Sequence, residues 1–164
     1  HLHSGRRVVF MDKEEKYLFE IAETFKRLGS KVKLLALIEK AHAEYQKCDL
    51  ENGFQTLLQA YEINKENPTI LRGFGCFWQA KGEFEKAIDY YKRALEFSNK
   101  KEIEYTLIGT AYYLQDKLDE AVEYFNLAID ENDDYDEAYE GRNQAMLENH
   151  LKILDLQESL KKYF

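Results

Sequence analysis

Residues 68–101 read PTILRGFGCFWQAKGEFEKAIDYYKRALEFSNKK, and the 34 residues that follow repeat the same pattern. Ten positions of the first copy have a residue of matching character 34 places later. The pairs are Leu71 with Tyr105, Phe74 with Ile108, Gly75 with Gly109, Trp78 with Tyr112, Gly82 with Asp116, Phe84 with Leu118, Ala87 with Ala121, Tyr91 with Phe125, Ala94 with Ala128 and Leu95 with Ile129. This agreement at one offset predicts an all-α solenoid of helix pairs and argues against a globular enzyme core.

The spacing inside each copy explains the helices. Large apolar residues recur every three to four positions, which is helical spacing. Gly82 and Asp116 interrupt the pattern near the fifteenth position, so each copy is expected to form two helices. Small residues such as Gly75 and Ala87 let the two backbones approach, and large residues such as Tyr91 fill the space between pairs. Asn67 followed by a proline is a good helix start.

Two weaker copies flank this pair. Residues 34–67 match mainly in their second half, where Gly53 stands at the position of Ala87. A fourth copy begins at Asp136 and then decays, with Asn143 and Asp155 at positions where a small residue is expected.

With these residues the chain resembles the tetratricopeptide repeat (TPR) family, whose 34-residue pattern is aromatic, Leu-Gly, aromatic, then Ala, aromatic, Ala. Residues 68–101 match nearly throughout and residues 102–135 almost as well, while the usual proline near position 32 is replaced by Asn99 and Asp133. The resemblance implies a right-handed α-solenoid of about three antiparallel helix pairs, with a concave groove for a segment of another protein.

The predicted organisation is a leader followed by one TPR domain. The leader, residues 1–11, is interpreted as artificial or disordered. The domain spans 12–164, with an N-terminal helix (12–33), repeats at 34–67, 68–101 and 102–135, and a capping helix (136–164). Asp12 and Glu15 are spaced as a capping pair, and Gly29-Ser30 is expected to end the first helix. The surplus apolar residues of the last helix leave a second reading open, in which it docks a partner.

Composition limits the partners. The net charge is -8, which argues against a nucleic-acid surface. No apolar run approaches the ~20 residues that span a bilayer, so membrane insertion is not expected. Two cysteines 28 residues apart, without metal-binding spacing, favour a reducing, cytoplasmic location.

The chain carries no recognisable catalytic motif, so no enzymatic activity and no cofactor are predicted. His42 and His150 have no neighbouring ligand at metal-binding spacing. The acidic run at 130–137 fails the calcium-loop pattern, because Tyr135 stands where glycine is required. Its charges fit better as companions of a helix N-terminus. No metal site is therefore predicted.

The family resemblance assigns groove positions to the first helix of each unit. The groove residues carried over to this chain are Ile38, His42, Tyr45, Arg72, Cys76, Gln79, Thr106, Thr110 and Tyr113. Relatives that bind a C-terminal carboxylate use several Lys, Arg and Asn residues, whereas this chain has Ile38, His42, Gly73, Ile103 and Leu107 at those places. The residues therefore favour a peptide with an apolar segment and a basic stretch, held by Tyr45 and Tyr113 as aromatic anchors.

Three functions fit these observations. The leading hypothesis is a non-enzymatic protein-binding module, an adaptor or scaffold, whose binding a charge reversal at Arg72 should weaken. The second is a structural scaffold that self-associates, as a homodimer for example, through its terminal helices. The third is a type III secretion-type chaperone, because those proteins are similar in length, acidity and design.

Overall fold

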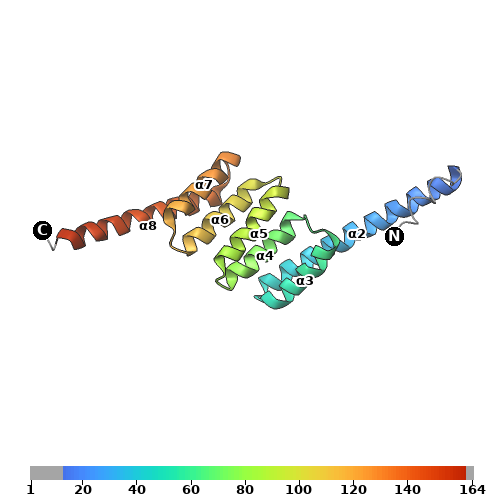
Figure 1. Ribbon diagram of the computed structural model, residues 1–164, viewed down its shortest axis with the longest axis horizontal. Coiled ribbons are helices and arrows are strands. Elements are labelled where there is room, and N and C mark those ends of the chain that lie inside the picture. Colours follow the sequence, from blue (N-terminus) through green and yellow to red (C-terminus); the bar gives the residue numbers. More distant parts are fainter. Residues whose placement is uncertain (1–12, 162–164) are drawn as a thin grey trace.

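The computed structural model describes residues 13–161, and this part of the chain contains seven α-helices and no strand. The helices are α2 (Lys13–Gln46), α3 (Leu50–Ile63), α4 (Pro68–Ala80), α5 (Phe84–Phe97), α6 (Lys101–Leu114), α7 (Leu118–Glu131) and α8 (Asp136–Lys161). They stack side by side in chain order, each packed against the next (Figure 1). The prediction of an all-α helical repeat is confirmed.

Within this stack, each unit consists of two helices joined by a tight turn. Cys48, Gly82 and Asp116 occupy these turns, and all three have a positive φ, of 60°, 77° and 63°. They stand 34 residues apart, so the turn recurs with the period of the sequence. The breaks predicted at Gly82 and Asp116 are confirmed. Asn67 caps α4 as expected, since its side chain accepts hydrogen bonds from the N–H groups of Thr69 and Ile70.

The helices of a pair approach closely where an aromatic ring meets a glycine. A Cβ built on Gly75 would lie 2.3 Å from Cε1 of Tyr91, whose side chain is fully buried. Phe125 makes two such contacts, because a Cβ on Gly109 would lie 3.0 Å from its ring and one on Gly141 would lie 2.5 Å away. One ring of α7 therefore fits against both α6 and α8.

The expected helix end at Gly29-Ser30 is wrong, because α2 runs without a break from Lys13 to Gln46. The hydroxyl of Ser30 donates to the carbonyl oxygen of Lys26 and so needs no partner outside the helix. Asp12 lies outside the described residues, as does the leader, and the capping pair stays a prediction.

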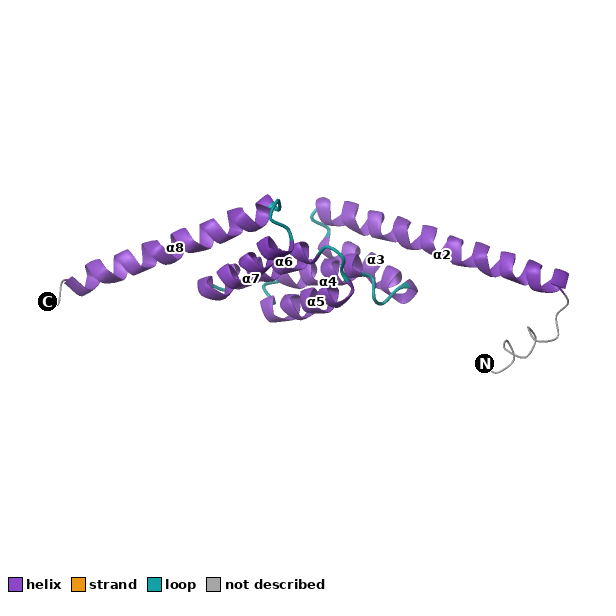
Figure 2. Ribbon diagram, turned by 90° about the horizontal axis from the view of Figure 1, so that it is seen from above, coloured by secondary structure: helices purple, strands orange, loops and turns teal. Residues whose placement is uncertain are grey.

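The two terminal helices, with 34 and 26 residues, are longer than the helices between them, which have 13 or 14. Only the second part of α2, from Leu34 on, packs against α3, and α8 has buried residues only at Ala138 and Ala145. Figure 2 shows both helices extending beyond the central stack in opposite directions. The prediction of one uninterrupted helix from Asp136 is confirmed up to Lys161, but only its first half covers the end of the solenoid.

Substituting Gly75→Ala should lower the free energy of unfolding by about 1–3 kcal/mol, because the added methyl group overlaps the immobile Tyr91 ring. Urea denaturation measures the change. Gln59→Ala, at an exposed position of α3, is the control and should leave the free energy of unfolding nearly unchanged. Equal effects of the two substitutions on stability would contradict this packing.

Substituting Cys48→Gly should raise the free energy of unfolding by about 0.5–1 kcal/mol, because glycine adopts the positive φ of this turn without strain. Gly82 already supplies glycine at the equivalent position. The control is Cys48→Ala, which also removes the thiol but keeps the strained backbone and should leave stability nearly unchanged. A Gly variant no more stable than the Ala variant would refute the assignment.

Candidate partner-binding face

The nine predicted groove residues all lie on the first helices of the three units. Ile38, His42 and Tyr45 lie on α2, Arg72, Cys76 and Gln79 on α4, and Thr106, Thr110 and Tyr113 on α6. We call the surface formed by these three helices and the start of α8 the A-helix face.

Polar contacts join the A-helix face from one unit to the next. The Tyr45 hydroxyl donates to the carbonyl oxygen of Gly73, 3.4 Å away, and links α2 to α4. Nε of Arg72 lies 3.0 Å from Oε1 of Glu104 and links α4 to α6. The Tyr113 hydroxyl donates to Glu148 and links α6 to α8. These contacts place the four helices next to one another, so predicted residues from separate repeats share one face.

The ion pair of Arg72 and Glu104 is the most deeply placed of these contacts. The Glu104 side chain is 0% exposed and that of Arg72 is 24% exposed. Neither Nε of Arg72 nor the two carboxylate oxygens make a well-aligned hydrogen bond, so the attraction is mainly coulombic. Arg72, which the sequence offered as a cation for a ligand, is therefore neutralised within the protein.

Sequence reasoning missed Glu104. It lies beside Ile103 and Tyr105 in a helix whose first turn is rich in acidic residues, where a charged side chain normally faces water. Only the distance to Arg72, on another helix, shows its role, and no spacing rule along the chain predicts that distance.

Tyr91 of α5 lies behind the middle of the face and contacts two of its residues on α4. Its hydroxyl donates to Oε1 of Gln79 at 3.2 Å and lies 3.6 Å from Sγ of Cys76. Burial raises the pKa of the Tyr91 phenol far above its ordinary value, so the group stays neutral. Desolvation by its neighbours also raises the pKa of the Cys76 thiol, opposed in part by Tyr91 and Arg72. The thiol is therefore mainly protonated at neutral pH, which makes it a poor nucleophile.

The two proposed aromatic anchors are both engaged within the protein. Tyr45 is half-buried, its ring fills the space above Gly53, and burial raises the pKa of its phenol. Tyr113 is half-buried, and its hydrogen bond with Glu148 raises the pKa of its phenol. Their rings can still offer an edge to a ligand, but their hydroxyl groups are already used.

The remaining positions differ in how much surface they offer. His42 is exposed and pairs with Gln46 at 2.8 Å, and Cys76 is also exposed. Ile38 is half-buried against the first core cluster. Thr106 and Thr110 are half-buried, and the Thr110 hydroxyl donates to the carbonyl oxygen of Thr106. The open part of the face therefore centres on α2 and α4.

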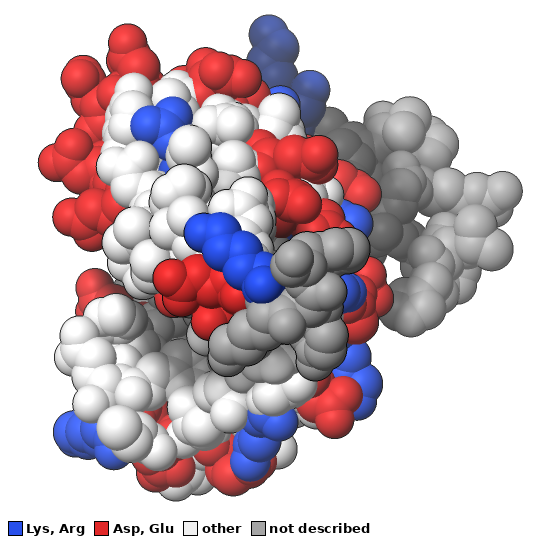
Figure 3. Space-filling view, turned by 90° about the vertical axis from the view of Figure 1, so that its left-hand side faces the viewer, with Lys and Arg blue, Asp and Glu red and all other residues white. Residues whose placement is uncertain are grey.

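The α8 end of the face is acidic. Glu137 and Glu140 are exposed at the start of α8. Nearby, burial and then the charges of Glu137 and Glu102 raise the pKa of Tyr135. Figure 3 views the molecule from this end and shows Asp and Glu gathered along one edge. The face thus changes from neutral at α2 to negative at α8.

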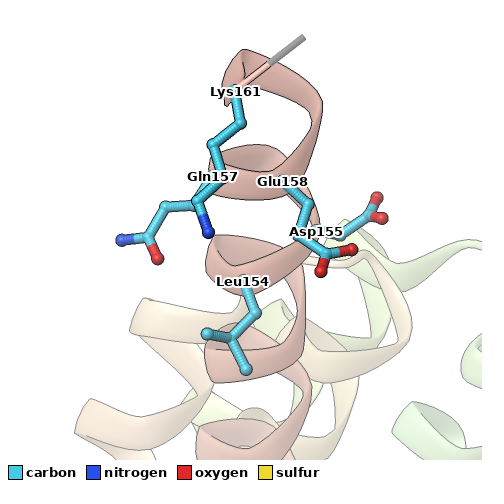
Figure 4. Close-up of a pocket in the computed structure, with 5 residues that line it drawn as sticks. All are labelled: Leu154, Asp155, Gln157, Glu158 and Lys161. Carbon is cyan, nitrogen blue, oxygen red and sulfur yellow. The ribbon is translucent and has the colours of Figure 1, made fainter.

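A shallow hollow lies on α8, away from this face. Its lining residues are Leu154, Asp155, Gln157, Glu158 and Lys161, all from one exposed helix (Figure 4). With no second wall, it cannot enclose a small molecule.

Two further classes of site were sought in residues 13–161. None of the helices described there is both long and apolar enough to cross a bilayer. No cluster of three or more His, Cys, Asp or Glu side chains among the same residues is arranged to hold a metal ion.

Three solved structures are similar to this chain in fold. The type III secretion chaperone SycD of Yersinia enterocolitica, bound to a peptide of the translocator YopD, is 17% identical, with a TM-score of 0.62 over 71% of this chain and 94% of that chain. The second TPR domain of human RPAP3, in complex with the HSP70 peptide SGPTIEEVD, is 12% identical, with a TM-score of 0.63. The match covers 71% of this chain and 98% of that domain. PilF of Pseudomonas aeruginosa is 19% identical, with a TM-score of 0.68. The match covers 74% of this chain and 56% of that chain.

The family comparison agrees with the structure. The tetratricopeptide repeat model matches residues 75–101 and 105–135, which cover α5, α7, most of α6 and the end of α4 from Gly75 on. Together with the repeated turns and the glycine–aromatic contacts, this match shows that the chain is a TPR domain protein.

Proposed function

We propose that this chain is a non-enzymatic interaction module, an adaptor or scaffold, that holds a segment of a partner protein on the A-helix face. The supporting observation is that exposed groove positions, His42 on α2 and Cys76 on α4, lie on helices held together by internal polar contacts. The face is thus pre-organised, which reduces the entropy lost when a peptide binds. Two solved structures of this fold, SycD and the second TPR domain of RPAP3, are described in complex with peptides, which supports this use of the fold.

The charge of the face points to the chemistry of the partner. Arg72 is neutralised by Glu104, while Glu137 and Glu140 remain exposed at the α8 end. A segment with an apolar part near Ile38 and basic residues toward α8 would be complementary. An acidic peptide such as the SGPTIEEVD bound by RPAP3 would meet no cluster of cations at these positions of the face, because Ile38, His42, Gly73, Ile103 and Leu107 stand where carboxylate-binding relatives have Lys, Arg and Asn.

A type III secretion-type chaperone is a second candidate. The likeness to SycD extends over 94% of that chain, so it includes the overall arrangement of helices and not only one repeat. Binding of a translocator-type protein would favour this reading over a general adaptor. Both readings include a single domain from residue 12 to 164 and a cytoplasmic location, which the two unpaired cysteines favour.

Peptides selected from a random display library should be enriched in an apolar residue followed by Lys or Arg, and Cys76→Arg should weaken their binding at least about tenfold. The substitution adds bulk and positive charge to the open part of the face. Isothermal titration calorimetry measures the affinity. Gln59→Arg, at an exposed neutral position of α3, is the matched control and should bind as the original chain does.

The acidic peptide SGPTIEEVD tests the expected charge preference directly. We expect no measurable binding, because the face lacks the Lys, Arg and Asn residues with which carboxylate-binding relatives hold their peptides. Tight binding of this peptide, or equal weakening by Cys76→Arg and Gln59→Arg, would contradict the proposed site.

Replacing Arg72 should lower the stability of the fold, because its main contact is with a buried residue of the protein itself. Arg72→Ala leaves the buried Glu104 carboxylate without its counter-charge and should lower the free energy of unfolding by about 2–4 kcal/mol. Adding Glu104→Gln should recover part of this loss in a urea-denaturation cycle. Lys81→Ala, which breaks an exposed pair with Glu51, is the control and should change stability by less than about 1 kcal/mol. Additive effects at Arg72 and Glu104 would show that the pair is unimportant.

A further inference from the structure

The first half of α2 carries an apolar stripe that nothing in the described structure covers. Its residues are Leu18, Ile21, Phe25, Leu28, Val32 and Leu35, at successive spacings of three, four, three, four and three. Apart from the half-buried Ile21, each is more than half exposed. This is the seam of a coiled coil, in which the apolar positions recur every 3.5 residues.

The projecting half of α8 has only shorter runs of this spacing. Its exposed apolar residues fall on two different sides of the helix, with Leu147, Leu151 and Leu154 on one and Ile153, Leu156 and Leu160 on the other. A continuous seam of six apolar positions on one side is therefore found on the projecting part of α2 and not on that of α8.

Gly29 supplies a second observation on the same helix. Glycine in a helix interior costs about 1 kcal/mol relative to alanine. The other glycines inside described helices, Gly53, Gly73, Gly75, Gly109 and Gly141, each face a side chain that leaves little or no room for a Cβ, but Gly29 has nothing within 4 Å. It lies seven residues from both Ala22 and Ala36, along one flank of the seam. These small residues leave room for a second helix backbone to approach.

The charges beside the seam indicate what that second helix is. Residues 17–23 contain two acids, Glu20 and Glu23, and no base, whereas residues 24–35 contain four bases and no acid. An identical helix running in the opposite direction would place Glu20 and Glu23 beside the segment of the second copy that contains Lys31 and Lys33, while Lys26 and Arg27 would lie near their own copies at the centre. A parallel copy would place acids beside acids and bases beside bases.

We propose that α2 pairs with α2 of a second copy as an antiparallel coiled coil. In this register Phe25 lies opposite Leu28 of the second copy, Ile21 opposite its Val32 and Leu18 opposite its Leu35, which gives six apolar layers around a two-fold axis. Glu20 and Lys31 are eleven residues, or about three helical turns, apart and so lie on the same flank. Lys31 borders the seam and Glu20 lies further out on the same side, so the long side chain of Glu20 reaches toward Lys31 of the second copy.

Sedimentation equilibrium of the full chain over a range of concentrations tests the proposal. We expect a monomer–dimer equilibrium, and Phe25→Glu should raise its dissociation constant at least about a hundredfold, because two buried rings are lost per dimer. Phe19→Glu is the matched control: Phe19 is exposed but lies off the seam, so the constant should stay within about twofold. An unchanged midpoint of urea unfolding, followed by the fluorescence of Trp78 in the repeat body, verifies that the variants fold. A chain that is monomeric throughout, or equal effects at Phe19 and Phe25, would overturn the proposal.

Charge reversal tests the direction of pairing. Glu20→Lys and Lys31→Glu should each raise the dissociation constant about five- to tenfold, because each creates two like-charge contacts per dimer. The double reversal should restore the original value to within about twofold. If the double variant is no better than the single ones, the antiparallel register is wrong.

Discussion

A ring on one helix occupies the space that a glycine leaves open on its neighbour, and the rest of the structure depends on this contact. Tyr91 fits against Gly75 within a unit. Phe125 fits against Gly109 in its own unit and against Gly141 at the start of α8, so it also sets the approach of one unit to the next. Because a buried ring cannot move aside, these contacts fix the spacing of the first helices and the geometry of the face that they form.

That spacing brings together groups that are far apart in the chain. Arg72 and Glu104 come from consecutive units, and their pairing turns a prominent cation into part of the internal structure. Tyr45 and Tyr113 are tied in the same way to neighbouring helices. The same side chains therefore hold the face together and limit the positive charge that it offers.

The projecting parts of α2 and α8 obey a different constraint. A helix without a second layer to pack on is marginal in water, since most helix stability in proteins comes from buried faces. Along α2, the uncovered seam, the unexplained glycine and the segregated charges occur together, which is the combination expected where a further helix is needed. The repeat body and this projection thus present two different surfaces, one suited to an extended or mixed segment and one suited to a helix.

The sequence alone was sufficient to predict the helix pairs and their turns, because the 34-residue period constrains small and large positions independently in each copy. It also placed the candidate groove residues on the first helices, because position within a repeat determines the helix on which a residue lies. It misjudged Gly29-Ser30, since glycine and serine are ambiguous signals that a helix can accommodate when the hydroxyl bonds within the preceding turn.

Only the tertiary structure decided which of these residues are available to a partner. Whether the charge of Arg72 is free or neutralised depends on Glu104. This residue stands 32 residues away, and no sequence pattern marks it as the partner of Arg72. Whether Tyr45 is an anchor or a packing residue depends on Gly53 across the turn. Period and spacing determine the helices, but the distance between side chains on different helices determines charge and exposure, and that distance exists only after packing.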